Sequence, residues 1–298
     1  MKKITIISAP KSFTEPHIAM IQRNAIQSWS KLEGVEVLLM GDEVGMAETT
    51  ALYRVRQISD VPCSESGVPL INGMFDRARK ESAGDLLAFV NADIILLPDF
   101  IDAARRVAGL HEKFLMVGQR WNLDVREELD FSSGYVDALQ KRTREQGSLH
   151  TLKASDYFVF PRGLFIEVPD LLVGRAGWDN WMMYYGTSQP WPAIDASADV
   201  VCIHQNHDYA HLPDARPHYG IEESQINVRL AGGWRHMYEL IDVNLRLENG
   251  RLHPQKYRLA RWLHKIELLL EPQDRQGKRW TLTRYLRRFR NKVMNYGA

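Results

Sequence analysis

The feature that most constrains this chain is the alternation of short apolar runs with helical patterns along its first third. Residues 4–8, 35–40 and 86–90 are apolar runs with the length and composition of buried strands. Residues 14–34 and 68–84 instead repeat apolar side chains at helical spacing. Strands that alternate with helices form βαβ units, which build a mostly parallel sheet covered on both faces. We therefore expect an α/β fold whose ligands bind beyond the carboxyl ends of the strands.

The rest of the chain follows this plan less regularly. Residues 114–118, 157–160 and 200–204 have the composition of three further strands, with long aromatic-rich segments between them. After residue 248 helical periodicity replaces the strand patterns. We expect one large domain over residues 1–248, followed by a basic amphipathic helical tail over residues 249–298.

Charge and cysteine content exclude several classes of protein. The 298 residues carry a net charge of +1, whereas general nucleic-acid-binding proteins present a large basic excess. The two cysteines, Cys63 and Cys202, form neither a metal-finger spacing nor a disulfide framework. The N-terminal apolar run is too short for a signal peptide, and no run is long enough to cross a membrane. We expect a cytoplasmic protein that does not bind nucleic acid.

A carboxylate follows the most convincing buried strand. Residues 86–90 end at Asn91-Ala92-Asp93, which places Asp93 at the mouth of the expected sheet. A carboxylate in such a position can hold a divalent cation against a diphosphate. On the triplet alone, a second interpretation has equal weight, in which Asn91 and Asp93 close the strand as an Asx-type turn.

Residues 68–97 resemble the donor-binding core of GT-A glycosyltransferases, which use nucleotide-diphospho-sugars. In that superfamily a helix with an Ala-Gly terminus, here Ala83-Gly84, precedes an apolar strand that presents a DxD-like motif. The resemblance extends over roughly residues 3–210 and concerns the fold superfamily rather than a named activity. It implies a GT-A-like, Rossmann-like mixed sheet, mostly parallel and flanked by helices, with the C-terminal helical extension added to it.

The same resemblance implies contacts to the donor and to a metal ion. Asp93 matches the metal-ligating acid, and Asp42 matches the acid that follows the second strand and contacts the nucleotide. Asn91 departs from the pattern, because its amide can bond a ribose hydroxyl or offer a neutral oxygen but removes one charge from the cation site. The implied cofactor is Mn²⁺ or Mg²⁺, bound more weakly than by two acids. The remaining implied donor contacts are Ala9 and Pro10, and Asn72 is a further candidate for binding the donor.

A second cluster lies at residues 174–181, Gly-Arg-Ala-Gly-Trp-Asp-Asn-Trp. Tryptophan faces stack on the C–H face of a pyranose, and a nearby carboxylate can take the proton of an attacking hydroxyl. We therefore expect Trp178 and Trp181 to bind the acceptor and Asp179 to act as general base. The resemblance agrees, because many inverting GT-A enzymes place their base in such a motif. Alternatively, both tryptophans are core anchors on a helix capped by Asp179 or Asn180.

Two histidines form a third candidate cluster. The strand at residues 200–204 ends at His204, and His207 follows, so that these imidazoles can complete the cation shell. GT-A enzymes often bring a histidine from a late strand to the metal. Histidines that only cap a strand end are one alternative. A zinc site that includes His211 and His218 is another, although their spacing matches no standard zinc pattern.

Two further polar residues stand at strand ends. Asp156 comes directly before the strand at residues 157–160 and is a candidate for binding a donor or acceptor hydroxyl. Arg120 follows the strand at residues 114–118 and can neutralise the charge of a diphosphate as its bond to the sugar breaks. A surface position explains Arg120 at least as well.

The sequence thus predicts a glycosyltransferase, with donor contacts in about residues 1–113 and acceptor contacts in about residues 114–248. It would move a sugar from a nucleotide-diphosphate donor to a hydroxyl of a glycan, polysaccharide or lipid-linked acceptor, inverting the anomeric carbon with Asp179 as base. A nucleotidyltransferase is an alternative, although residues 8–13 lack its glycine-rich loop. A catalytically silent sugar- or nucleotide-binding protein is another. The absence of GxGxxG and GxxxxGK[ST] argues against dehydrogenases and P-loop enzymes.

The end of the chain has a membrane-related interpretation. Residues 275–292 carry eight Lys or Arg among Trp280, Tyr285, Leu286 and Phe289. This composition suits attraction to anionic lipid headgroups, which would hold the protein peripherally at the inner face of the membrane. A solvated helix that packs on the domain has equal weight.

Overall fold

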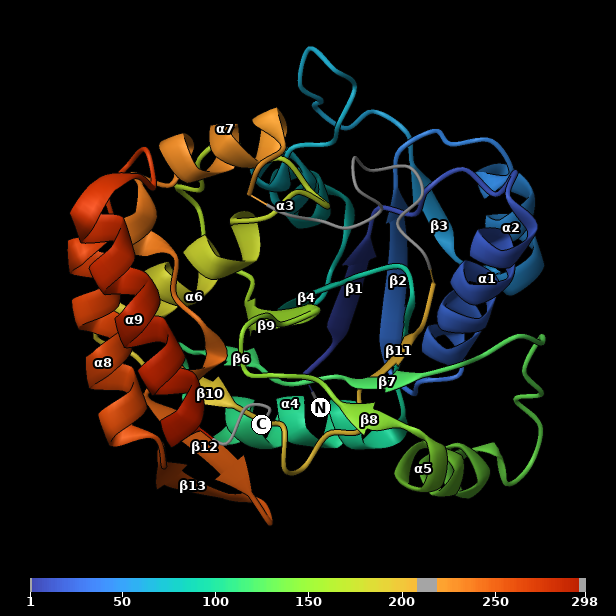
Figure 1. Ribbon diagram of the computed structural model, residues 1–298. Coiled ribbons are helices and arrows are strands. Elements are labelled where there is room, and N and C mark those ends of the chain that lie inside the picture. The colour runs from blue at the N-terminus through green and yellow to red at the C-terminus, as the bar shows by residue number, and fades with distance from the viewer. Residues whose placement is uncertain (1, 208–218, 295–298) are drawn as a thin grey trace.

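A computed structural model describes residues 2–207 and 219–294 of the chain, and a nine-stranded sheet lies at the centre of the described part (Figure 1). The strands lie in the order β13-β12-β10-β6-β9-β4-β1-β2-β3. Their bounds are β1 (Ile4–Ser8), β2 (Val35–Met40), β3 (Arg56–Ile58), β4 (Leu86–Val90), β6 (Leu115–Val117), β9 (Tyr157–Pro161), β10 (Ala193–Asp195), β12 (Leu245–Glu248) and β13 (Arg251–Pro254).

Neighbouring strands of this sheet are mostly parallel. β1 pairs in parallel with β2 and β4, β2 with β3, and β10 with β6 and β12. β9 is antiparallel to its neighbours β4 and β6, and β12 and β13 form an antiparallel hairpin. The predicted mixed, mostly parallel sheet is confirmed. Because β9 runs backwards, the residues before it lie at the edge where β1 and β4 end.

A smaller, four-stranded sheet has the order β5-β11-β7-β8. It consists of β5 (Ile94–Ile95), β7 (Trp121–Leu123), β8 (Ser148–Leu149) and β11 (Ile203–Gln205), and α5 (Tyr135–Gln146) packs on it. A strand was predicted at residues 200–204, and the observed strand β11 begins later, at Ile203. β11 pairs with β5, which begins directly after Asp93, so this sheet brings the end of β11 to the end of β4.

Helices cover both faces of the large sheet. α1 (Pro16–Ser30) and α4 (Pro98–Leu110) pack on one face, and α3 (Ile71–Glu81) and α6 (Trp178–Thr187) pack on the other. Side chains of β4 alternate between the two cores, with Phe89 on the α3 and α6 side and Val90 on the α1 and α4 side. α2 (Met46–Tyr53) packs beside α1 near the β3 edge (Figure 1).

The C-terminal part is helical only after a hairpin. Residue 249, where the tail was predicted to begin, is the turn between β12 and β13, because Asn249 and Gly250 both adopt positive φ there. α8 (Arg258–Leu270) and α9 (Gly277–Val293) follow, so the helical tail starts at Arg258. Before the hairpin come α7 (Glu222–Leu230) and the 3-10 turns Trp234–His236 and Leu240–Asp242.

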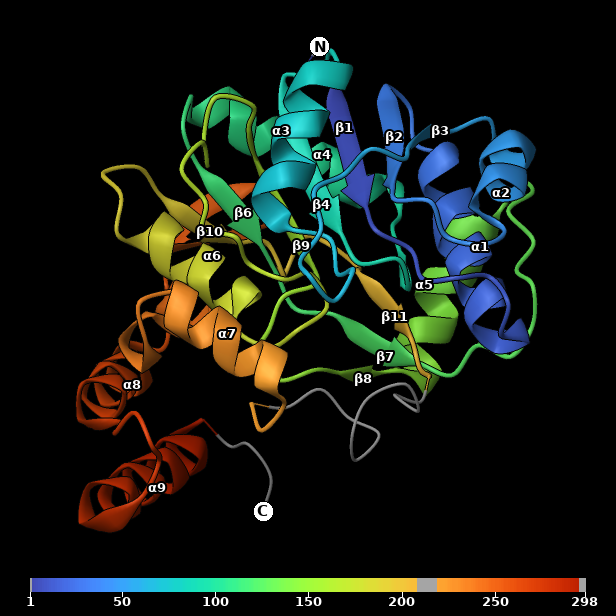
Figure 2. The ribbon, with the colours of Figure 1, turned by 90° about the horizontal axis from the view of Figure 1, so that it is seen from above.

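Figure 2 shows α8 and α9 side by side at one end of the molecule, next to α7. None of the helices described is both long enough and apolar enough to span a membrane.

Candidate active site

A cavity of about 940 Å³ opens at the edge of the large sheet where β1, β2 and β4 end. Its lining includes residues 9–12 after β1 and residues 91–93 after β4. Residues 173–176 and the start of α6 line it as well. The predicted location beyond the carboxyl ends of the strands therefore holds a cavity large enough for a nucleotide-sized ligand.

The loop after β1 is fixed to helix α1. The buried side chain of Gln22 donates through Nε2 to the carbonyl oxygen of Lys11 at 2.9 Å, and its Oε1 accepts from the backbone nitrogen of Lys11 at 2.6 Å. Ala9 and Pro10, which the resemblance assigned to the donor, line the cavity in this loop.

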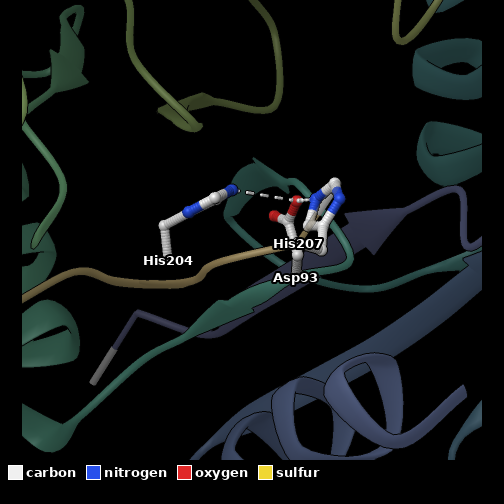
Figure 3. Close-up of side chains that lie close together, drawn as sticks. All are labelled: Asp93, His204 and His207. Carbon is white, nitrogen blue, oxygen red and sulfur yellow. Dashed lines mark hydrogen bonds and ion pairs between the residues drawn. The ribbon is translucent and has the colours of Figure 1, made fainter. Parts of the chain in front are cut away.

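Asp93 lies between two histidines (Figure 3). Its Oδ2 is 3.0 Å from Nε2 of His207 and 3.5 Å from Nε2 of His204. One ligand atom from each of the three side chains lies within 4.8 Å of the other two. The pairing of His204 with Ile94 in the small sheet sets this arrangement. The structure thus brings together the three residues predicted as metal ligands.

The chemistry of this cluster fits a divalent cation. Oδ1 of Asp93 and both ring nitrogens of His204 are buried and make no hydrogen bond with a described residue. Burial disfavours the charged carboxylate, but the positive charges of His204 and His207 and the hydrogen bond with His207 outweigh this effect and hold the pKa of Asp93 well below its usual range. An ionised carboxylate and two imidazoles form a donor set suited to first-row cations such as Mn²⁺.

Asn91 holds a second carboxylate in place. Its Nδ2 donates to Oδ1 of Asp156 at 2.7 Å, and Nη1 of Arg120 lies 2.9 and 3.0 Å from the two carboxylate oxygens of Asp156. All three residues line the cavity, and the Arg120 side chain is only 14% exposed, so it is not a surface arginine. An aspartate at position 91 would face another carboxylate at this distance. The departure from the DxD-like pattern therefore has a local physical reason.

Asp179 lines the cavity from the first turn of α6. The helix begins after Gly177, whose φ of 106° is accessible to glycine, and neither Asp179 nor Asn180 caps it. Burial is the largest influence on Asp179 and, with the negative charge of Asp156, raises its pKa to about 6 against the opposing hydrogen bonds from the backbone. A carboxyl with such a pKa is suited to accept a proton near neutral pH.

The two tryptophans of this cluster are core residues. Trp178 packs edge-on against Phe89 at 4.7 Å between ring centroids and against Phe158 at 5.0 Å. Trp181 stacks on Tyr185 at 5.1 Å, is only 6% exposed and does not line the cavity. A sugar has no access to the faces of Trp181 in this structure, so the core-anchor alternative describes it correctly. Only Trp178 reaches the cavity wall.

Two residues predicted to contact the donor, Asp42 and Asn72, do not line the cavity. Asp42 is exposed and accepts a hydrogen bond from Nε2 of Gln57 at 3.1 Å, although both of its chain neighbours line the cavity. Asn72 is at the start of α3 and donates to Oδ1 of Asp170 at 2.5 Å. Neither side chain lines the cavity in this structure, so the structure does not support these two donor contacts. His211 and His218 lie outside the described residues.

His150 and Lys153 also line the cavity, and the sequence patterns missed them. Burial, followed by the charge of Arg120, lowers the pKa of His150 to about 4, so its imidazole is neutral at physiological pH. Both residues come shortly before β9, and the antiparallel direction of β9 brings them to this edge. Their closeness to Asp156 in the sequence is the signal that could have found them.

No family model matches the chain, and no curated protein matches it. Solved structures do match. The crystal structure of S. aureus TarS 1–349 in complex with UDP-GlcNAc matches with a TM-score of 0.51 and 14% identity, over 77% of this chain and 65% of that one, which is less than two thirds of its length. TarS 1–349 in a second crystal structure matches with a TM-score of 0.51 and 11% identity, over 90% of this chain and 80% of that one. The chain has a GT-A fold.

A further match has lower similarity. Glucosyl-3-phosphoglycerate synthase from Mycobacterium tuberculosis, in complex with Mn²⁺, UDP and phosphoglyceric acid, matches with a TM-score of 0.48 and 15% identity over 78% of each chain. In this chain β4 lies between β9 and β1 in the sheet, and Asp93, which follows β4, lines the cavity.

Proposed function

We propose that this protein transfers a sugar from a nucleotide-diphosphate donor to a hydroxyl group. The observation that carries the proposal is that one cavity in a GT-A fold is lined by both Asp93, with its two histidines, and Asp179. The first group suits a cation that holds a diphosphate, and the second suits a proton acceptor. TarS, which shares the fold, was crystallised with UDP-GlcNAc, and this supports a nucleotide-sugar donor here.

The donor would lie along the carboxyl ends of β1, β2 and β4. Ala9 and Pro10 would contact the nucleoside, and the diphosphate would lie at Asp93. A Mn²⁺ or Mg²⁺ ion held by Asp93, His204 and His207 would neutralise the charge that builds up on the diphosphate as it leaves. Arg120 would add positive charge near the diphosphate. Its ion pair with Asp156 would partly neutralise this charge and hold both side chains in the cavity wall.

The chemical step would be one displacement at the anomeric carbon. The acceptor oxygen forms a bond to this carbon while the bond from the carbon to the diphosphate oxygen breaks, and its electron pair leaves with the nucleoside diphosphate. Asp179 takes the proton of the acceptor hydroxyl. Such a step inverts the anomeric configuration. The half of the chain after about residue 113, which supplies Asp179 and Asp156, would bind the acceptor, which we propose to be a glycan or a lipid-linked hydroxyl.

Binding of the donor is testable by thermal unfolding. A UDP- or GDP-linked sugar at a hundred times its dissociation constant, with Mn²⁺, should stabilise the protein by about 2.7 kcal/mol and raise the midpoint by about 5 °C. The control is each nucleotide sugar without metal and Mn²⁺ without nucleotide. If no donor in a panel of such sugars shifts the midpoint, the proposal fails. Release of pyrophosphate instead of nucleoside diphosphate would indicate a nucleotidyltransferase.

The pH dependence of transfer should report Asp179. Because its pKa is about 6 in the folded protein, the base is ionised above this pH, and the turnover rate at saturating donor and metal should fall about tenfold per unit below it. The measurement is turnover between pH 4.5 and 8 in wild type and in Asp179→Asn. The residual turnover of the variant should not fall below pH 6 in this way. If turnover of the variant falls below pH 6 as in wild type, the titrating group is not Asp179.

A further inference from the structure

Helix α9 exposes an apolar stripe along its outward face. Leu282, Tyr285, Phe289 and Val293 follow one another at helical spacing, and all four are exposed, with Tyr285 at 70%. Large exposed apolar side chains that line up in this way indicate a surface that another apolar phase covers. We call this set the apolar stripe of α9.

Basic side chains of α9 flank the apolar stripe, and α9 itself carries no acidic ones. Arg284, Arg288 and Lys292 are exposed between and beside the apolar residues. α9 contains no Asp or Glu anywhere in its 17 residues. A helix with an apolar stripe bordered only by cations is complementary to a surface that is anionic at its headgroups and apolar below them.

The inward face of α9 is fixed by buried ion pairs. Arg290, which is 1% exposed, pairs with Glu267 of α8 at 3.2 Å and with Glu239. Arg287 pairs with Glu267 at 2.6 Å and with Glu271 at 3.3 Å. Rotation of the helix would leave these buried charges unpaired, which is costly. The apolar stripe is therefore held outward rather than left exposed by a loosely attached helix.

The same ion pairs connect α9 to the cavity. Glu239, the partner of Arg290, lines the cavity from the segment that precedes α8. The ion pair between Arg290 of α9 and Glu239 at the cavity therefore fixes the position of the outward face of α9 relative to the cavity. Figures 1 and 2 show α9 lying along α8, and in Figure 2 it lies on the side of α8 away from α6.

We propose that the outward face of α9 docks on an anionic lipid bilayer. The aromatic and aliphatic side chains of the apolar stripe enter the region below the headgroups, and Arg284, Arg288 and Lys292 contact the anionic headgroups. Docking in this way holds the cavity near the membrane surface, where an acceptor anchored in the bilayer would be found. A nucleic acid would use the cations but leaves the apolar stripe exposed, so the lipid surface fits better.

Vesicle co-sedimentation of the full chain tests the proposal without any donor, so its result does not depend on sugar transfer. Wild type should bind vesicles that contain phosphatidylglycerol, should bind pure phosphatidylcholine vesicles far more weakly, and should lose binding as salt rises. Arg284→Glu/Arg288→Glu should lower the partition coefficient by at least about 25-fold, because each basic residue near an anionic membrane contributes on the order of fivefold. Tyr285→Ser/Phe289→Ser should lower it as well, with little change in salt dependence.

The matched control is Lys141→Glu/Arg144→Glu, which reverses two exposed charges on α5 and should leave binding unchanged. Circular dichroism and the thermal midpoint check that each variant is folded. Equal binding of wild type to anionic and neutral vesicles would overturn the proposal, as would full binding by folded Arg284→Glu/Arg288→Glu. Dimerisation that Tyr285→Ser/Phe289→Ser abolishes, without vesicle binding, would assign the apolar stripe to a second copy instead.

Discussion

Replacing Asp93 by alanine is expected to abolish stabilisation by donor and Mn²⁺ and to lower sugar transfer by at least about 1000-fold. The reason is that Asp93 is the only carboxylate of the three-residue cluster in the described part of the chain, and a bound cation supplies several kcal/mol to the departure of a diphosphate. The measurement combines thermal midpoints with and without Mn²⁺ and turnover with the best donor of the panel.

Asp42→Ala is the matched control for this experiment. Asp42 is an exposed aspartate that follows β2 but does not line the cavity, so its removal should leave the manganese-dependent shift and turnover within about twofold of wild type. Full retention of the manganese-dependent shift in Asp93→Ala would show that the cation, if bound, is held elsewhere. A large loss of turnover or of the manganese-dependent shift in Asp42→Ala would instead support the donor contact that the resemblance assigned to Asp42.

Asp179→Asn is expected to keep donor binding and to lower transfer by about 100- to 10,000-fold. Asparagine preserves the shape of the side chain but cannot accept the proton of the acceptor hydroxyl, and general base catalysis contributes this range. The measurement is turnover at saturating substrate, compared with the donor-dependent thermal shift. Asp170→Asn, at an exposed position, is the control and should be neutral. Near-normal turnover in Asp179→Asn would transfer the role of base to another residue such as Asp156.

The same substitution should make the folded protein more stable at neutral pH. The pKa of Asp179 is about 6 in the folded protein against 3.8 for the free side chain, so the folded state disfavours its ionisation by up to ~3 kcal/mol above pH 6. Below about pH 4 the carboxyl is protonated in both states and the penalty vanishes. Asp179→Asn should therefore raise the free energy of unfolding at pH 7 by on the order of 1–3 kcal/mol and leave it nearly unchanged at pH 4. A loss of activity together with a gain in stability excludes misfolding as its cause.

Local patterns identified the strands and the end of β4 because they depend on side chains that are near in sequence. An unbroken apolar run such as residues 86–90 is stable only where both faces are covered, so it indicates a central strand wherever it occurs. The residue that follows a central strand must lie at the sheet edge. For this reason the position of Asp93 could be predicted from the sequence, and so could the helices on either face.

The direction of a strand does not appear in its side-chain pattern. Residues 157–160 predicted a strand, and β9 is one, but only the structure shows that it runs antiparallel between β4 and β6. That direction decides that Asp156, His150 and Lys153 enter the cavity. The convergence of His204 and His207 on Asp93 likewise depends on β11 pairing with β5, a contact over more than 100 residues.

The sequence by itself determined the α/β class and the succession of strands and helices along the first third of the chain. It also identified the two segments that contain Asp93 and Asp179 as candidate parts of the site. Only the tertiary structure decided which polar side chains face the cavity: Glu43 does and Asp42 does not, and Trp178 reaches the wall while Trp181 is enclosed by the core. The physical reason is that periodicity records whether a side chain is buried, whereas its partners are set by packing between segments that lie far apart in the sequence.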